Sequence, residues 1–372
     1  MSQKISNMET ASASVSIFPR RAISLVLLYW KSDEKLFAWF ALSALCMLSL
    51  MGVATAVAIN EWYKYFYNAI QAIDQQMFYD LLFVFVAIVS FSVVRSVLIT
   101  YLVGVFSIKW RRWLAEHYLS TWIIKSRGRN EINQCIDNPD QRIADDINKF
   151  TFETVDLFCG LVYTIASVTS FGAVLISISG DGSFWSVTIP AYMFWVAVLY
   201  AVLGTYISQK LGFKLISLSN TLQRSEADFR YLLVRFRDCS RLSRVSKRRY
   251  EKQVISDKLD VCIAVVRSTI RVKMRLSLFT ESYSQLTLVF SSMLSVPRFF
   301  SGSIMLGDVM QINSAFGNLC NNLSWFINAF PRLADWKATT DRLIAFEGAL
   351  ALLAENYDVI INLDTICEVE GF

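Results

Sequence analysis

The stretch LFAWFALSALCMLSLMGVATAVAI, from Leu36 to Ile59, contains no Asp, Glu, Lys or Arg. At the rise of an α-helix, a segment of this length crosses a hydrocarbon layer of about 30 Å. Inside a bilayer no water is present to satisfy backbone polar groups, so a spanning segment of this kind must be helical. The stretch therefore predicts a membrane-spanning helix.

Five further stretches have comparable length and are mostly apolar. They are Leu81–Ile108, Leu157–Ser179, Phe184–Ser208, Leu276–Phe300 and the more polar Gly302–Pro331. The first four contain only three charged residues, which are Arg95, Glu281 and Arg298. Hydrophobic residues make up 54% of the chain, which is more than a soluble domain of this size tolerates. We therefore predict an all-α membrane protein with six transmembrane helices.

Positive charge lies almost entirely in the segments on one side of these stretches. The Lys and Arg counts are five before Leu36, eight in Lys109–Lys149, seventeen in Lys210–Arg275 and three after Pro331. The links on the other side contain only Lys64 and Arg298. The positive-inside rule then places both termini of this multi-pass membrane protein in the cytoplasm. The net charge of +5 follows from this topology, so no nucleic-acid partner is expected.

The expected domain organisation follows from the same pattern. Residues 1–30 are predicted to be a flexible cytoplasmic tail, residues 31–352 the six-helix domain, and residues 353–372 a C-terminal stub. Apolar residues keep helical spacing from Gln209 to Arg237, so the fourth span is expected to continue into the cytoplasm as a long helix.

A helix start is recognisable in the first long cytoplasmic link. Asn138 is a residue type that caps helices, Pro139 fits the first helical position, and Gln141 stands where a capping box places Gln or Glu. The acidic side chains of Asp140, Asp145 and Asp146 suit the positive end of a helix. We therefore predict a capped helix that runs unbroken from this point into the third span.

The sixth stretch carries a polar stripe. Seven residues fall within about a third of the helix circumference: Gln311, Ser314, Asn318, Asn321, Asn322, Trp325 and Asn328. Amides at membrane depth are costly unless they face other helices or water. Packing between helices needs one or two such residues, so we interpret the stripe as the lining of a water-filled substrate cavity. Simple helix packing is the alternative.

Arg95 and Glu281 are the intramembrane charges, and each is a functional candidate by default. For Glu281, an interfacial position is an equal alternative. The chain lacks a GxxxxGK(S/T) phosphate loop, an HExxH motif and any metal-ligand cluster. We therefore predict no catalytic residues, no metal site and no ATP hydrolysis by this chain alone.

Several strings resemble motifs of one branch of the ABC transporters. NPDQRIADD, from Asn138 to Asp146, resembles that branch's NPDQRIAxD signature. WRRWLAEHYL at Trp110–Leu119 resembles its WRxWLTxxYL stretch, and EADFRYLLVR at Glu226–Arg235 resembles its EADFRxxLVR motif. The branch includes YddA-like permease–ATPase fusions, peroxisomal acyl-CoA transporters and SbmA/BacA-like peptide transporters. The resemblance covers about Lys31–Leu352.

The resemblance implies an exporter-type (type IV) fold, with six helices per subunit and a homodimer in the lipid of the bacterial inner membrane. It also implies that ATP and Mg²⁺ bind to an ATPase domain on a partner or missing segment, with no cofactor in this chain. The implied contacts with that ATPase domain are Asn138, Pro139, Asp140, Gln141, Arg142, Asp145, Glu226 and Arg230. The chain departs from the branch at residues 239–249, where basic residues replace an acidic run.

Three functions follow from the resemblance. The first is the permease component of an ABC transporter that moves a peptide-like, cobalamin-like or amphipathic small molecule. The second is a stand-alone, SbmA/BacA-like, proton-coupled peptide importer, for which Glu61, Glu281 and Asp308 are the candidate carboxylates. The third, from a different class, is a truncated remnant that transports nothing or a membrane scaffold.

Overall fold

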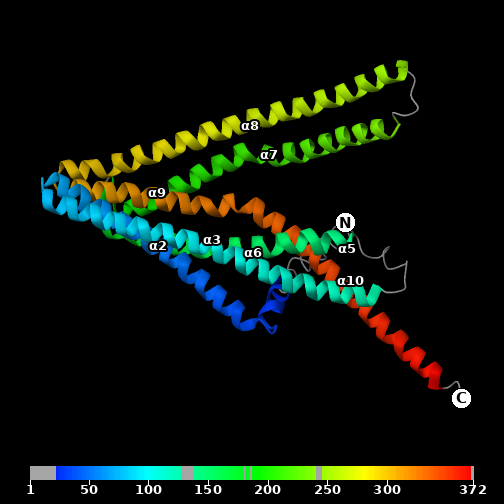
Figure 1. The fold of residues 1–372 in the computed structure, drawn as a ribbon. Helices are drawn as coiled ribbons and strands as arrows, with labels where there is room; N and C mark the ends of the chain where they lie inside the picture. Colours follow the sequence, from blue (N-terminus) through cyan, green and yellow to red (C-terminus); the bar gives the residue numbers. More distant parts are fainter. Residues whose placement is uncertain (1–21, 127–137, 180, 185–186, 240–244, 370–372) are drawn as a thin grey trace, which may run out of the picture. The chain divides into compact units, whose positions relative to one another are not determined.

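The described part of the chain is almost entirely helical. The computed structural model describes residues 22–126, 138–179, 181–184, 187–239 and 245–369 (Figure 1). These residues fall into two compact units. Unit 1 contains the chain up to Ser170 together with the segment from Asn328 onward, and unit 2 contains Phe171–Ile327.

Two long helices of unit 1 lie side by side, α2 (Lys35–Gln71) and α3 (Gln75–Ser126) (Figure 1). Ile73, with a φ of 56°, makes the sharp turn between them. Asp74 caps α3, because its Oδ1 accepts the backbone N–H of Met77 at 3.0 Å. The first expected span thus continues for several turns beyond Ile59 before the chain reverses.

Aromatic side chains form the core of unit 1 around the C-terminal part of α3. Trp110 and Phe150 are fully buried, and Tyr29 stacks on Trp110 with 5.9 Å between ring centroids. Tyr29 belongs to a helical segment, residues 22–30, within the stretch expected to be a flexible tail. That part of the stretch is ordered because its apolar face is buried in this core. Residues 1–21 lie outside the described part.

The helix that follows the first cytoplasmic link begins differently from the prediction. It consists of α5 (Pro139–Gln141), the π-helical turn η1 (Arg142–Asp146) and α6 (Ile147–Ser179). Asn138 has left-handed backbone angles (φ 48°, ψ 65°), and its side chain makes no capping hydrogen bond to the first turn. The predicted side-chain cap is therefore wrong, and the helical run is interrupted by one π-helical turn. Pro139 does occupy the first helical position.

Unit 2 contains a short hairpin that the sequence did not indicate. Strand β1 (Asp181–Phe184) pairs antiparallel with β2 (Val187–Pro190), with Gly182 opposite Ile189. Helix α7 (Tyr192–Cys239) starts only after this hairpin, so the expected start of the fourth span at Phe184 is wrong. β-Branched residues at 187–189 favour the strand, and Pro190 cannot donate the next backbone hydrogen bond.

Helices α7 and α8 (Val245–Phe300) form a long hairpin (Figure 1). The rings of Tyr200 and Tyr283 stack, and each hydroxyl donates to the other residue's backbone carbonyl, at 3.1 and 3.2 Å. A side chain at Gly204 would have its Cβ 2.2 Å from the Tyr283 ring, so glycine is required there. The continuous helix through Gln209–Arg237 confirms the predicted extension of the fourth span. Residues 240–244 of the basic run lie outside the described part.

By length and composition, four helical segments of the described chain are able to cross a membrane. They are Lys35–Gln71, Gln75–Ile123, Pro139–Ser179 and Tyr192–Arg237. The fifth and sixth expected spans are present as helices, in α8 and in α9 (Leu306–Asn328), but they do not reach the same apolar character. Their apolar character is lower because α8 contains many hydroxyl side chains and α9 contains several amides. The last helix, α10 (Phe330–Val369), belongs to unit 1.

Candidate functional site

The predicted polar stripe lies on α9 as one face of a single helix. Gln311 is buried, while Ser314, Asn318, Asn322 and Trp325 are half-buried, and Asn321 and Asn328 are exposed. The opposite face is apolar over its first half, where Ile312, Phe316 and Leu319 are fully buried. Helix α9 is therefore amphipathic, as the sequence predicts.

Two amides of the stripe use their N–H groups on their own helix. Asn318 donates from Nδ2 to the Ser314 carbonyl at 2.9 Å, and Asn322 donates to the Asn318 carbonyl at 2.7 Å. These bonds fix the side chains without reaching a neighbouring helix. They therefore hold these two amides against their own helix.

A different amide of α9 holds the helix against α8. Asn313 accepts the hydroxyl proton of Ser291 at 2.8 Å and donates from Nδ2 to Ser292 Oγ, also at 2.8 Å. Both groups of the amide are thus used between helices. The sequence pattern missed this residue because it lies outside the polar stripe.

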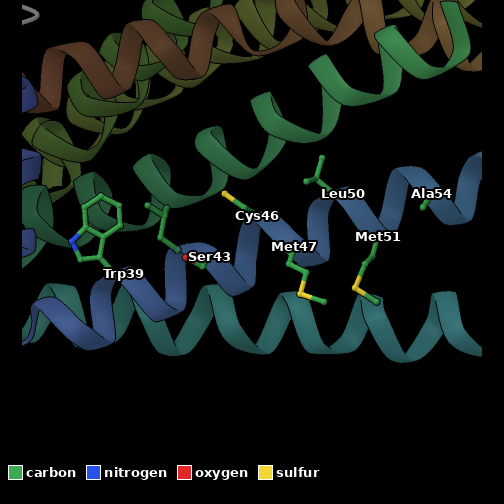
Figure 2. A pocket seen from close by; sticks show the side chains of 8 residues that line it. Trp39, Ser43, Cys46, Met47, Leu50, Met51 and Ala54 are labelled. Atoms are coloured by element: carbon green, nitrogen blue, oxygen red, sulfur yellow. The ribbon is translucent and has the colours of Figure 1, made fainter. Parts of the chain in front are cut away.

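An apolar groove of about 710 Å³ runs along one face of α2 (Figure 2). Its lining includes Trp39, Cys46, Met47, Leu50, Met51 and Ala54. All of its lining residues belong to α2, so the α9 stripe contributes nothing to it. The predicted substrate cavity along the stripe stays a prediction.

Arg95 lies between the two helices of the α2–α3 pair. Its Nη1 donates to the Leu48 carbonyl at 3.2 Å, and its guanidinium covers Gly52. Glu281, the other predicted intramembrane charge, is exposed on α8. On α7, Glu226 and Arg230 are exposed one turn apart, and Asp228 between them forms an ion pair with Lys258 of α8 at 3.3 Å.

The residues of the NPDQRIADD segment divide into an outward set and an inward set. Asn138, Asp140, Gln141 and Asp145 are exposed. Arg142 instead turns toward the helix, where its Nη1 lies 2.7 Å from Asp146 Oδ2. Arg142, one of the predicted contacts with an ATPase domain, therefore forms an ion pair with Asp146 of its own chain.

Asp146 joins the start of α6 to α10. It is 5% exposed and accepts hydrogen bonds from Arg342 Nε at 2.9 Å and Nη2 at 2.7 Å. Burial by itself raises the pKa of the Asp146 carboxyl, but hydrogen bonds from Arg342 and Arg142 outweigh burial and lower it below its ordinary value. The carboxylate thus stays charged and bonded at neutral pH.

Further polar contacts join α6 and α10 along their length. Arg332 pairs with Glu153 at 2.7 Å and with Asp156 at 2.6 Å, while Trp336 Nε1 donates to Thr154 Oγ1 at 2.7 Å. Together with the Asp146–Arg342 pair, these contacts are termed the α6–α10 latch. Sequence reasoning missed the latch as a unit. The signal available in the sequence was that Asp146 is the last residue of the NPDQRIADD match.

Comparison with protein families gives a match over most of the chain. The SbmA/BacA-like family matches residues 32–351. This range contains the four segments of the described chain that are long and apolar enough to span a membrane.

Individual relatives are ABC transporter proteins. "Inner membrane ABC transporter ATP-binding protein YddA" of Escherichia coli is 32% identical over 79% of the chain and 54% of the relative. "ABC transporter D family member 2, chloroplastic" of Arabidopsis thaliana is 28% identical over 92% of the chain and 47% of the relative. An uncharacterized ABC transporter ATP-binding protein of Synechocystis is 27% identical over 86% of the chain and 48% of the relative. The chain thus spans about half the length of these relatives.

Proposed function

The chain belongs to the SbmA/BacA-like family, and from this membership we propose that it is the membrane-spanning permease component of an ABC-type transporter. In this proposal α8 and α9 provide the fifth and sixth spans of an exporter-type fold. Two copies form a homodimer in the bacterial inner membrane, with both termini in the cytoplasm. ATP and Mg²⁺ bind to an ATPase domain that is separate from residues 1–372.

The observation that best supports coupling is that the helical segment beginning at Pro139 leads, through the π-helical turn η1, directly into α6. The exposed residues Asp140, Gln141 and Asp145 stand at the start of a helical run that continues to Ser179 as a candidate span. The α6–α10 latch ties this run to α10 as well. A force applied to the exposed acidic residues would therefore be transmitted along a rigid element to the membrane-spanning part.

Reconstitution tests the proposal directly. The purified chain is placed in proteoliposomes, and the ATP-binding portion of the E. coli relative is added with Mg²⁺-ATP. We expect faster ATP hydrolysis than with empty liposomes, and ATP-dependent movement of a fluorescent peptide or of cobalamin. Asp140→Lys combined with Asp145→Lys should abolish the stimulation, whereas Asp335→Lys, an exposed acidic residue of α10, should not.

A proton-coupled importer is the second candidate, because the matching family is named for SbmA/BacA-like proteins. Glu61 and Glu281 are exposed carboxylates, while Asp308 Oδ2 accepts the Met305 N–H at the start of α9. Uptake driven by a pH gradient without ATP would support this candidate over the first. Absence of uptake under both conditions would favour a remnant that transports nothing.

A further inference from the structure

Arg95 lies near the middle of the apolar stretch Leu81–Ile108 of α3. It is the only charged residue in the stretch Leu81–Ile108, which falls within the candidate span Gln75–Ile123. The stretch extends for similar lengths on both sides of it, so in a bilayer this guanidinium lies near the midplane. Charges at that depth are rare and face protein, water or a ligand.

The neighbouring helix holds the guanidinium in a fixed position. Arg95 Nη1 donates to the Leu48 carbonyl at 3.2 Å. A Cβ atom at Gly52 would lie 2.8 Å from Nη1 and 2.9 Å from Cζ, so the glycine provides the space that the guanidinium occupies. The cation is thereby oriented before any ligand arrives.

The charge of Arg95 has no compensating anion within the described residues. No acidic side chain among them forms an ion pair with it, and its Nε is buried without a hydrogen-bond partner. One backbone carbonyl satisfies only one of the five N–H donors of a guanidinium. Arg95 is half-buried, and a cation held partly out of water without a counter-ion is costly, so its fixed position suits an anion brought by a ligand.

We propose that Arg95 binds an anionic group, a carboxylate or phosphate, of the molecule that the protein transports. This inference rests on the proposed transport function. The N–H groups of the guanidinium that are not bonded to Leu48 are suited to bind such groups, and the low dielectric constant of its surroundings strengthens the interaction. The midplane position separates this site from lipid headgroups, which lie at the membrane surface.

The test is a binding experiment that requires neither ATP nor transport. The full chain in lipid nanodiscs is titrated with dansylaminoundecanoate and with its neutral carboxamide, and the signal of empty nanodiscs is subtracted. We expect the wild-type protein to prefer the carboxylate by about ten-fold, the scale of a hydrogen bond to a charged group. Arg95→Gln should remove the preference, and Arg95→Lys should keep a weaker one.

A pair of glycine variants covers the case in which Arg95→Gln fails to fold. Gly52→Ala should lower the carboxylate preference because it displaces the guanidinium. Gly104→Ala, on the same helix as Arg95, should leave the preference unchanged, because no atom lies within 4 Å of its added Cβ.

Three outcomes would overturn the inference. The first is equal binding of the carboxylate and the carboxamide by the wild type, and the second is a carboxylate preference that survives Arg95→Gln. The third is that Arg95→Gln loses the dimer while the wild type shows no carboxylate preference. The last outcome would assign Arg95 to an ion pair between subunits. Because the binding assay contains no ATPase, its result can be interpreted even if the proposed coupling to an ATPase domain fails.

Discussion

Asp146 and Arg342 are 196 residues apart in the sequence and are joined by two hydrogen bonds, of 2.9 and 2.7 Å, between guanidinium and carboxylate. Asp146 is the last residue of the π-helical turn η1 and is bonded to Arg142 of the same turn. The pair therefore fixes the start of α6 against α10. π-Helical turns often occur at functional sites, and this one lies in the segment expected to contact an ATPase domain.

Replacing Asp146 tests how much the latch contributes to stability. Asp146→Asn removes the charge that two guanidiniums share, and we expect a loss of about 2 kcal/mol, the scale of buried hydrogen bonds to charged groups. In a chain of this size the apparent Tm should fall by several degrees. The measurement is thermal unfolding of the detergent-purified protein, followed by tryptophan fluorescence.

Asp335→Asn is the matched control, because Asp335 of α10 pairs with Lys149 at 3.4 Å through exposed side chains. Exposed pairs contribute little, so its Tm should stay within about one degree of the wild type. In a double-mutant cycle, Asp146→Asn and Arg342→Gln should be strongly non-additive. Additive effects would show that the two residues act independently.

The pKa of Glu347 is shifted in the opposite direction to that of Asp146, so its ionisation should affect stability in the opposite way. Burial raises the pKa of the half-buried Glu347 carboxyl, and the charge of His117 partly offsets this. Because the folded-state pKa exceeds the unfolded value, ionisation of Glu347 destabilises the fold as pH rises through the folded pKa. Glu347→Gln should therefore raise the Tm at pH 8. The gain should shrink as the pH approaches 4.5, the ordinary value for Glu.

The Asp146 carboxyl has a lowered pKa, so its stabilisation is present above the ordinary Asp value and is lost only as pH falls through the lower folded value. The Tm difference between wild type and Asp146→Asn should therefore persist from pH 8 to pH 5. A difference that disappears within that range would contradict the bonded, ionised state of Asp146.

The sequence predicts well what depends on composition and local spacing. Uninterrupted apolar stretches such as Leu36–Ile59 specify helices, and the polar face of α9 follows from helical periodicity. The resemblance to the ABC transporter branch is confirmed by the family match over residues 32–351. Each of these properties is encoded within one segment, so no knowledge of tertiary contacts is required.

Long-range relationships are not encoded in this local way. Nothing near Gly52 in the sequence indicates that Arg95 of the next helix occupies the space above it. The capping role expected for Asn138 failed because its backbone adopts a left-handed conformation. The roles of the polar stripe and of the exposed motif residues stay predictions, because they concern a substrate and a partner.

Gly204 tests the packing of the α7–α8 hairpin. Gly204→Ala would place a methyl group 2.2 Å from the Tyr283 ring and force apart the reciprocal bonds of Tyr283 with Tyr200. Overpacking of this kind costs about 1–3 kcal/mol, so the Tm should fall by several degrees. Gly317→Ala on α9, where nothing lies within 4 Å of the added Cβ, should be tolerated. Equal melting temperatures for both variants would contradict the close packing at Gly204.

Amides on two faces of α9 should respond differently to the same substitution. Asn318 and Asn322 each donate an N–H to a carbonyl of their own helix, so Asn318→Leu with Asn322→Leu should leave expression and Tm nearly unchanged. If these amides line the substrate path, uptake in proteoliposomes containing the ATPase partner should fall at least about ten-fold. Asn313→Leu removes two interhelical hydrogen bonds and should lower the Tm instead. Normal uptake by the double variant would assign the polar stripe to helix packing.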